Sequence, residues 1–339
     1  MAGITHLKEF TKETLRGFVD ESIAAQTPSV VDRFVKNNVT YNTNFAYDII
    51  QRSNHIAAMI GLGAEKPVVD RHATASVMGE LAHFGLKDVV TIEELYAINQ
   101  ARNSGEQSAM IEKLLNRAID LNNALDLRIQ VEKMKAIGLG RNDYNKNGVK
   151  VALDYKIPAN HKVVLTDGND WDEVSRDVVG DLLAWDKTYR DTNKKKADAI
   201  LMTRETLAKL TKNSLIIAEA GRPAGAIRVS EAEVRTVLSG FGLPEIVIIE
   251  DTSATVKDVE TSEEETIVFF PSNRVIFISE GVGEFLTGPN PDDDNFAPVR
   301  VLDAYDLRTP KRSVFEVSQS GFAVLENPSL LLHADVSPA

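Results

Sequence analysis

The sequence contains no cysteine among its 339 residues. This absence excludes disulfide bonds and thiolate chemistry, and it fits a protein made in a reducing cytosol. No run of about eighteen apolar residues occurs, so we expect no membrane-spanning helix. The first residues (MAGITHLKEFTKETLRG) are charged throughout and lack an apolar stretch, so we expect no secretory signal.

Basic residues are in the minority, since 38 lysines and arginines stand against 50 aspartates and glutamates, for a net charge of −12. This balance argues against a general nucleic-acid binder, because phosphate contacts need clustered lysine and arginine. An acidic protein can still surround DNA, because repulsion between the like charges keeps the DNA from adhering to the protein surface. The length allows two or three domains, or one elongated subunit with lobes and a sizeable core.

The motifs of common enzyme classes are also absent. The chain has no Gly-Lys pair and therefore no Walker A loop, and it has neither a Gly-x-Ser-x-Gly elbow nor a His-Glu-x-x-His motif. The six histidines never stand at helical ligand spacing, and we interpret His72 and His83 as exposed polar side chains in preference to metal ligands. We therefore predict no catalytic residue, no cofactor and no metal, and we expect a protein that is not an enzyme.

One segment matches a metal-binding pattern. Residues Asp143–Gly148 read D-x-N-x-N-G, with Asp154 at the twelfth position, which resembles a calcium loop. The alternative is a hairpin turn at Asn147–Gly148, which we favour because position twelve lacks the usual glutamate and a strand follows. For the acidic run Asp292–Asp294, an exposed loop is favoured over a cation site.

The strongest pattern is a long amphipathic helix from about Glu106 to Ile137. Apolar residues recur three and four positions apart along one face: Ile111, Leu114, Ala118, Leu121, Leu125 and Ile129. At about 1.5 Å per residue the helix would be ~48 Å long, more than a compact domain of this size needs. Gly138 and Gly140 are predicted to take the left-handed conformations that end it. The length indicates a flat, elongated building block.

The segments before this helix are predicted to form an arm, a ribbon and a short helix. Residues Ile4–Ala24 have the pattern of an amphipathic helix, and the polar stretch Thr27–Thr43 reads as an extended arm. Gly61–Val90 reads as two strands with a loose tip, too poor in large apolar side chains to be stable alone. Thr91, with Glu94 three residues later, is predicted to cap a short helix.

After Asp170, helices and strands alternate, which predicts a mixed α/β lobe with a small central sheet. The expected elements are a helix at Asp170–Tyr189, a strand at Ala197–Thr203, a helix at Arg204–Lys212, a helix at Ser230–Gly242 and a strand at Pro244–Asp251. From Thr266 to the C-terminus the pattern is one of strands.

This order of parts resembles the major capsid proteins of tailed bacteriophages, and more narrowly the lambda-type major head protein E family. Four segments carry the resemblance. They are the junction from spine helix to hairpin (DLRIQVEKMKAIGLGRNDYNKNGVKVALDY), a strand-to-helix step (KADAILMTRETLAKL), an Asn-containing turn before a strand and a Gly-rich stretch (FFPSNRVIFISEGVGEFLTGP), and the closing strands (SVFEVSQSGFAVLENPSLLLHADV).

The resemblance implies an α+β fold, the HK97-like capsid fold named after phage HK97. Such a subunit has an N-arm, an extended E-loop, a P-domain with a long spine helix, and an α/β A-domain. On this chain the parts would be residues 1–44 for the N-terminal arm, 45–90 for a strand and the E-loop, 91–169 for the P-domain helix and strands, 170–309 for the A-domain, and 310–339 for C-terminal strands that return to the P-domain.

The function that the resemblance implies is that of a major head protein. Pentamers and hexamers would close an icosahedral shell around double-stranded DNA, assembled in the host cytoplasm and retained in the virion. Expected partners are other copies of the chain, a separate scaffolding protein, a portal protein and DNA bound without sequence specificity, with the need for a decoration protein left open. The arm would order only on assembly.

Three residues of the expected E-loop are candidates for contact between subunits: Lys66, Arg71 and His72. Lys66 and Arg71 would pair with acidic residues of a neighbouring subunit. An encapsulin-type nanocompartment shell is the alternative within the same fold, and a soluble α/β enzyme is a more distant one.

Overall fold

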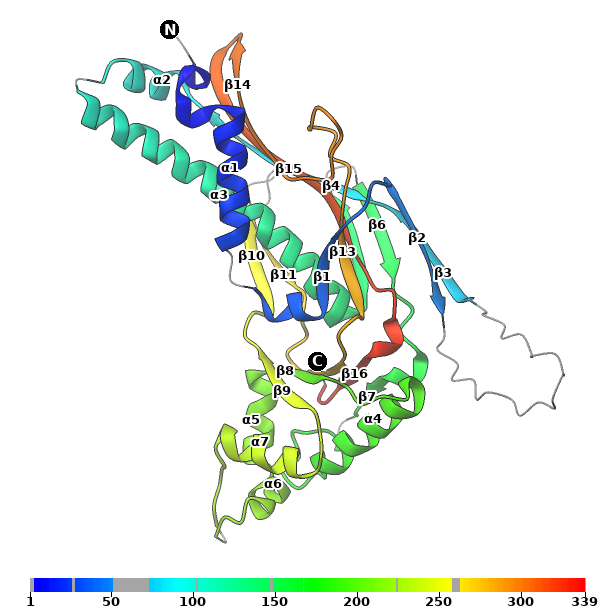
Figure 1. Cartoon of the computed structure of the whole chain (residues 1–339). Helices are drawn as coiled ribbons and strands as arrows, with labels where there is room; N and C mark the ends of the chain where they lie inside the picture. The colour runs from blue at the N-terminus through cyan, green and yellow to red at the C-terminus, as the bar shows by residue number, and fades with distance from the viewer. Residues whose placement is uncertain are drawn as a thin grey trace, which may run out of the picture.

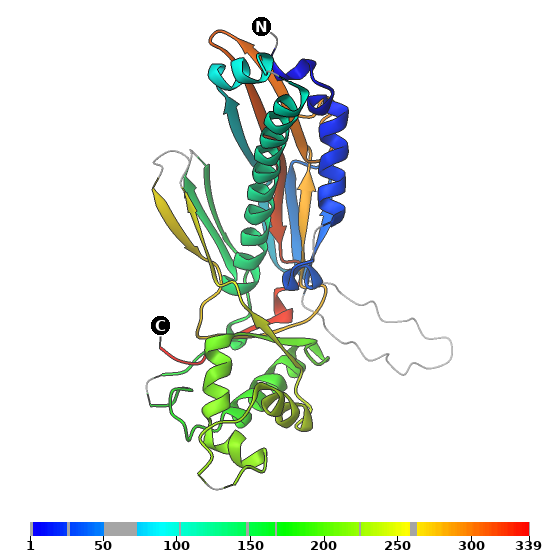
Figure 2. The ribbon, with the colours of Figure 1, turned by 90° about the vertical axis from the view of Figure 1, so that its left-hand side faces the viewer.

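The computed structural model describes residues 3–25, 28–50, 73–101, 103–146, 149–166, 168–223, 225–257 and 263–338. The molecule is elongated, with a long sheet and a long helix at one end and an α/β lobe at the other (Figure 1). Figure 2 shows helices α1 (Lys12–Ala25) and α3 (Ser104–Leu139) against one face of the long sheet. Within those ranges, no helix combines the length and the apolar character needed to cross a membrane.

The predicted long helix is confirmed as α3, which has 36 residues and is called the spine helix below. At its N-terminus the side chain of Asn103 accepts a hydrogen bond from the backbone N–H of Glu106 at 2.8 Å, which satisfies one of the free amides of the first turn. At its C-terminus Gly140 has a φ of 67°, the left-handed conformation that was predicted there.

The prediction for Gly138 was wrong, because this glycine lies inside the spine helix. A Cβ atom at Gly138 would lie 2.3 Å from the carbonyl oxygen of Phe269. The residue is therefore required for a close approach between the helix and the neighbouring backbone, and not for a turn. Its own carbonyl accepts a hydrogen bond from Arg274 at 2.8 Å.

The long sheet is built around β15 (Lys311–Val324). One side of β15 pairs antiparallel with β4 (Ala82–Val90), and the other side pairs antiparallel with β14 (Val301–Arg308) and β13 (Gly283–Gly288). Strand β1 (Val35–Val39) adds to β13 in parallel. The face toward the spine helix is apolar: Phe315 and Val317 of β15 are buried in one cluster with Leu114, Ala118 and Leu125 of that helix.

The N-terminal segment is packed against this sheet within the single chain. The predicted helix over Ile4–Ala24 is partly correct, because two 3-10 turns (Ile4–His6 and Lys8–Phe10) precede α1. The expectation that the arm orders only on assembly was wrong for the stretch around β1, where Phe34 and Val35 are buried in the main core. Burial of these side chains stabilises the arm before any partner is present.

The prediction of a ribbon over Gly61–Val90 is partly correct, and its residues 61–72 lie outside the described residues. Its paired strands are β2 (Asn44–Ile50) and β3 (Ala73–Glu80), joined in antiparallel register. The stretch Ala82–Val90, which was predicted to belong to the ribbon, forms β4 of the long sheet instead. Every second side chain of β4 is partly buried, which gives the strand an apolar side that packs toward the spine helix. Pairing with β15 buries this apolar side, and pairing within the ribbon would not.

The α/β lobe contains the predicted small central sheet, with the strand order β7-β16-β12-β8-β9. Its strands are β7 (Lys162–Val164), β8 (Ala199–Thr203), β9 (Glu245–Ile249), β12 (Arg274–Ile278) and β16 (Leu331–Asp335). Its helices are α4 (Val178–Asn193), α5 (Arg204–Lys212), α6 (Ser214–Glu219) and α7 (Glu231–Gly240). Helix α4 starts later than predicted, because the side chain of Asp177 caps it through the N–H of Gly180 at 2.8 Å.

Two hairpins lie beside the C-terminal half of the spine helix: β5 (Arg141–Lys146) with β6 (Val149–Asp154), and β10 (Ser253–Lys257) with β11 (Glu264–Val268). The first hairpin decides between the two interpretations of the calcium-like pattern. Asp154 lies opposite Arg141, so the would-be ligands are spread along paired strands and do not encircle an ion. The paired strands confirm the favoured hairpin, and its predicted turn residues Asn147 and Gly148 lie outside the described residues.

Candidate assembly surfaces

A buried arginine, Arg300, connects the spine helix to the long sheet. The side chain of Arg300 is only 5% exposed, and it donates to Asn122 at 2.7 Å, to Asp126 at 2.5 Å and to Gln319 at 3.0 Å. The first two partners are on the helix and the third is on β15. A guanidinium with its donors arranged in this fork fixes both distance and orientation, so helix and sheet are held as one rigid plate.

A second arginine ties the other half of the spine helix to its neighbours. Arg117 donates to Asp88 of β4 at 2.5 and 2.7 Å and to Glu94 of α2 (Ile92–Asn99) at 2.9 Å. These hydrogen bonds, with Asp88 the larger contributor, raise the pKa of Arg117. Glu94 also completes the predicted capping box with Thr91, which is confirmed. One carboxylate therefore both caps α2 and docks it on the spine helix.

Ion pairs also hold the N-terminal segment against this plate. The buried ammonium of Lys133 lies 2.5 Å from Asp32, which precedes β1, and the exposed ammonium of Lys12 on α1 lies 2.6 Å from Asp294. Asp292 contacts His83 at 3.3 Å, and Asp293 accepts backbone N–H groups of its own loop. The acidic run Asp292–Asp294 is thus an exposed loop that holds α1 and β4.

The lobe is joined to the end of the spine helix by a polar cluster. Arg274 on β12 pairs with Asp335 on β16 at 2.6 and 2.9 Å and donates to the carbonyl of Gly138 at 2.8 Å. His333 lies 2.8 Å from the carbonyl oxygen of Ile137. Burial lowers the pKa of His333 to about 3, so its imidazole is neutral at physiological pH and serves as a fixed donor. The joint is therefore built to be rigid.

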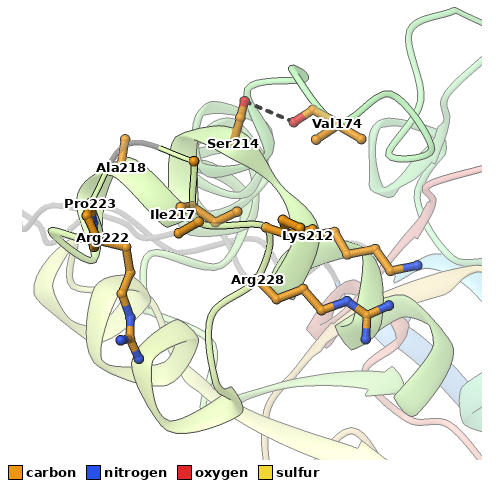
Figure 3. A pocket seen from close by; sticks show the side chains of 11 residues that line it. Val174, Lys212, Ser214, Ile217, Ala218, Arg222, Pro223 and Arg228 are labelled. Atoms are coloured by element: carbon orange, nitrogen blue, oxygen red, sulfur yellow. Dashed lines mark hydrogen bonds between the residues drawn. The ribbon is translucent and has the colours of Figure 1, made fainter.

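A cavity of about 520 Å³ (Figure 3) opens beside α6, at the end of the lobe that lies far from the spine helix (Figure 1). We call it the tip pocket. It is lined by the end of α5, by α6, by the loop that follows α6, and by Val174. Asn213 holds these parts together, because its side chain donates to the carbonyl of Val174 at 3.1 Å and accepts from the first amides of α6.

The wall of the tip pocket combines apolar and cationic side chains. Ile227 is 81% exposed and Val174 is 52% exposed, although both are large and apolar. Lys212, Arg222 and Arg228 supply positive charge, and Figure 3 shows Lys212 and Arg228 extending toward the same side of the pocket. This mixture is suited to binding a carboxylate that stands beside an apolar group.

The residues predicted for subunit contact, Lys66, Arg71 and His72, lie outside the described residues, so they stay predictions. Sequence reasoning missed Lys212 and Arg228. They are 16 positions apart by number, on different elements, and no local spacing marks them as neighbours. Within the described ranges, no group of three or more histidine or acidic side chains is placed to hold a metal ion.

Comparison with known families decides what kind of subunit this is. The model of phage major capsid protein E matches residues 21–336, nearly the whole chain. The chain belongs to the phage major capsid protein E family. This membership confirms the predicted family and the predicted function as the major capsid protein of a tailed bacteriophage. Members of this family are structural proteins of the virion, and a capsid protein assembles into a multimeric shell.

Solved structures share the fold of this major capsid protein. A candidate capsid protein of a prophage of Escherichia coli CFT073 is 12% identical, with a TM-score of 0.59 and coverage of 96% of this chain and 98% of that chain. A phage-related protein of Bordetella bronchiseptica RB50 is 11% identical, with a TM-score of 0.56 and coverage of 95% and 98%. The capsid structure of cyanophage P-SCSP1u is 10% identical, with a TM-score of 0.51 and coverage of 100% and 95%.

These three likenesses confirm the predicted α+β, HK97-like fold. No curated protein matches the sequence.

Proposed function

We propose that copies of this chain form pentamers and hexamers that close an icosahedral shell around double-stranded DNA. The observation that carries the proposal is the match of the capsid protein E family to residues 21–336. The rigid plate of spine helix and long sheet supports it, because a shell wall needs subunits that do not deform under load. Symmetric closure lets many modest interfaces hold such a shell even when each is weak.

Within this proposal the chain keeps the division expected from its sequence. Residues 1–44 are the N-terminal arm, 45–90 a strand and the E-loop, 91–169 the P-domain, 170–309 the A-domain, and 310–339 the returning strands. The exceptions are β4, β13 and β14, which lie in the long sheet beside the spine helix, and β7 and β16, which lie in the sheet of the lobe. The role is structural and not catalytic. Assembly takes place in the host cytoplasm, with a portal protein at one vertex and with DNA packaged without sequence preference.

Assembly is proposed to need a separate scaffolding protein. We expect the chain expressed alone to give open sheets, tubes or shells of irregular size, and co-expression with the phage's scaffolding protein to give uniform shells. Electron microscopy of the high-speed pellet compares the two. Uniform shells of normal size from the chain alone contradict the scaffold proposal.

Lys66 and Arg71 are proposed to pair with acidic residues of a neighbouring subunit. The double variant Lys66→Glu with Arg71→Glu should block shell formation, because it places like charges across the contact. The matched variant Lys66→Arg with Arg71→Lys keeps both charges and should assemble. Far-UV circular dichroism should report a folded subunit in both. Unimpaired shells from the charge-reversed variant count against these contacts.

A further inference from the structure

A second cleft, of about 280 Å³, lies where the N-terminal segment meets the plate of spine helix and long sheet. We call it the arm cleft. It is lined from α1, from β1, from the spine helix and from the long sheet, which lie close together in Figure 2. Its lining includes Val19, Asn37, Val39, Gln130, Lys133 and Phe285.

Lys133 brings hydrogen-bond donors to the arm cleft that the chain does not use. Its side chain is 1% exposed, and its ammonium group donates one hydrogen bond, to Asp32 at 2.5 Å. The ring of Phe285, whose centroid lies 5.8 Å from Nζ, stabilises the charge but supplies no oxygen acceptor. An ammonium group has three N–H donors. Two of them therefore have no acceptor among the residues that the structure describes.

Gln130 brings an unused acceptor to the same cleft. Its Oε1 atom is buried and has no hydrogen-bond partner within the described ranges of the chain. Its Nε2 atom faces Asp32, 3.5 Å from each carboxylate oxygen. Because a carboxylate only accepts hydrogen bonds, Asp32 fixes which end of the amide faces it, and Oε1 is turned the other way. Gln130 and Lys133 are three residues apart on one helix, so the unused acceptor and the unused donors share one face.

Strand β1 adds an unpaired backbone edge to the arm cleft. The N–H of Thr40 donates to the carbonyl of Thr287, next to β13, at 2.8 Å. Alternate residues of a parallel strand bond to the neighbour, so Asn37 and Val39 turn their backbone groups away from β13. The N–H of Val39 donates to the side chain of Asn38 at 2.8 Å. The N–H and C=O of Asn37 and the C=O of Val39 therefore remain at an edge that no described strand covers.

These unused groups match the backbone of an extended peptide. Each peptide unit has a C=O that can accept from Lys133 and an N–H that can donate to Gln130, and a strand beside β1 would also pair with Asn37. The charges of the lining favour a neutral occupant, because three cations stand against three carboxylates. They are Arg16, Lys133 and Arg300 against Asp20, Asp32 and Asp126. An ionic ligand would be attracted by one set and repelled by the other.

We propose that the arm cleft binds an extended segment of the scaffolding protein, which adds to β1 as a further strand and is held by Lys133 and Gln130. The proposal rests on the proposed function and places one contact of the separate scaffolding protein. A permanent contact between copies of a chain buries a large and mainly apolar area. The arm cleft is small and rich in charged side chains, which suits a partner that binds reversibly during assembly.

Replacing Gln130 with methionine separates binding from folding. The variant keeps the size of the side chain and removes a buried acceptor that has no partner, so the midpoint of thermal unfolding should equal or exceed that of the wild type. Its affinity for the phage's purified scaffolding protein, measured by isothermal titration calorimetry, should fall by about tenfold, because a peptide N–H loses its acceptor. The control Gln107→Met makes the same change on the spine helix outside the cleft, and it should bind like the wild type.

Hydrogen–deuterium exchange of the wild-type chain locates the contact without any substitution. Mass spectrometry of the segment Val35–Val39 should show exchange slowed by about tenfold or more when the scaffolding protein is bound, because the amide of Asn37 gains an acceptor. Binding without slower exchange in this segment overturns the docking site. Slower exchange there in particles assembled without the scaffolding protein assigns the cleft to a second copy, which also contradicts the proposal.

The outcomes separate the arm cleft from the shell function. If the wild type forms shells and Gln130→Met binds the scaffolding protein as tightly as the wild type does, the function stands and the docking site is overturned. A lower unfolding midpoint together with weaker binding would show that Gln130 acts through folding, which also overturns it. If the wild type does not bind the scaffolding protein, the docking site and the scaffold proposal both fail. Shell formation is then judged separately, by electron microscopy of the pellet.

Discussion

Replacing Arg300 with methionine should lower the free energy of unfolding by about 3–5 kcal/mol, because it removes the guanidinium that lies 2.5 Å from Asp126 in a largely buried site. The variant also removes the guanidinium N–H groups that donate to Asn122 and Gln319. The spine helix and the long sheet then lose the connection that fixes the distance between them. Urea unfolding of the unassembled subunit, followed by circular dichroism, measures the loss.

The matched control for this prediction is Arg308→Met. Arg308 is the last residue of β14, the strand that begins directly after Arg300. Its side chain is exposed and forms no ion pair within the described chain. The same chemical change there should alter the unfolding free energy by less than about 0.5 kcal/mol. Equal effects at the two positions would show that the Arg300 network does not hold the spine helix to the sheet.

Alanine substitutions at two helical glycines should change stability in opposite directions. Gly17→Ala on α1 should stabilise the subunit by about 0.4–1 kcal/mol, because a Cβ there meets nothing within 4 Å and alanine favours the helix. Gly138→Ala should destabilise by about 1–3 kcal/mol, because its Cβ would lie 2.3 Å from the carbonyl oxygen of Phe269.

Thermal unfolding of the two variants in parallel tests this pair. The midpoint of Gly17→Ala should lie above that of the wild type, and the midpoint of Gly138→Ala below it. The spine helix of Gly138→Ala is also expected to shift away from the backbone at Phe269, which disturbs the joint to the lobe at Arg274. A midpoint for Gly138→Ala at or above the wild-type value contradicts the close approach described here.

The sequence predicted those elements that depend on residues close together in the chain, such as helices with an apolar face and capping boxes. The spine helix follows from a face repeated every three or four residues, and α5 (Arg204–Lys212) was predicted with the bounds that the structure has. The capping box of Thr91 and Glu94 was also readable, since both partners are three residues apart.

Contacts between distant segments were not predictable in this way. Strand β16 (Leu331–Asp335) lies between β7 and β12, and nothing in its apolar run names these partners. Lys133 and Asp32 are separated by 101 positions. The same reason explains the errors at β4 and Gly138, because each depends on what the segment packs against. Periodicity shows that a face is buried, but it does not show by which element.

The most direct test of the central claim is a single-particle cryo-electron microscopy reconstruction of the particles formed with the scaffolding protein. We predict a closed icosahedral shell whose wall is fitted by this fold, with pentamers at the vertices and hexamers between them. Particles without fivefold positions, such as rings or filaments alone, or a wall that this fold does not fit, would contradict the account.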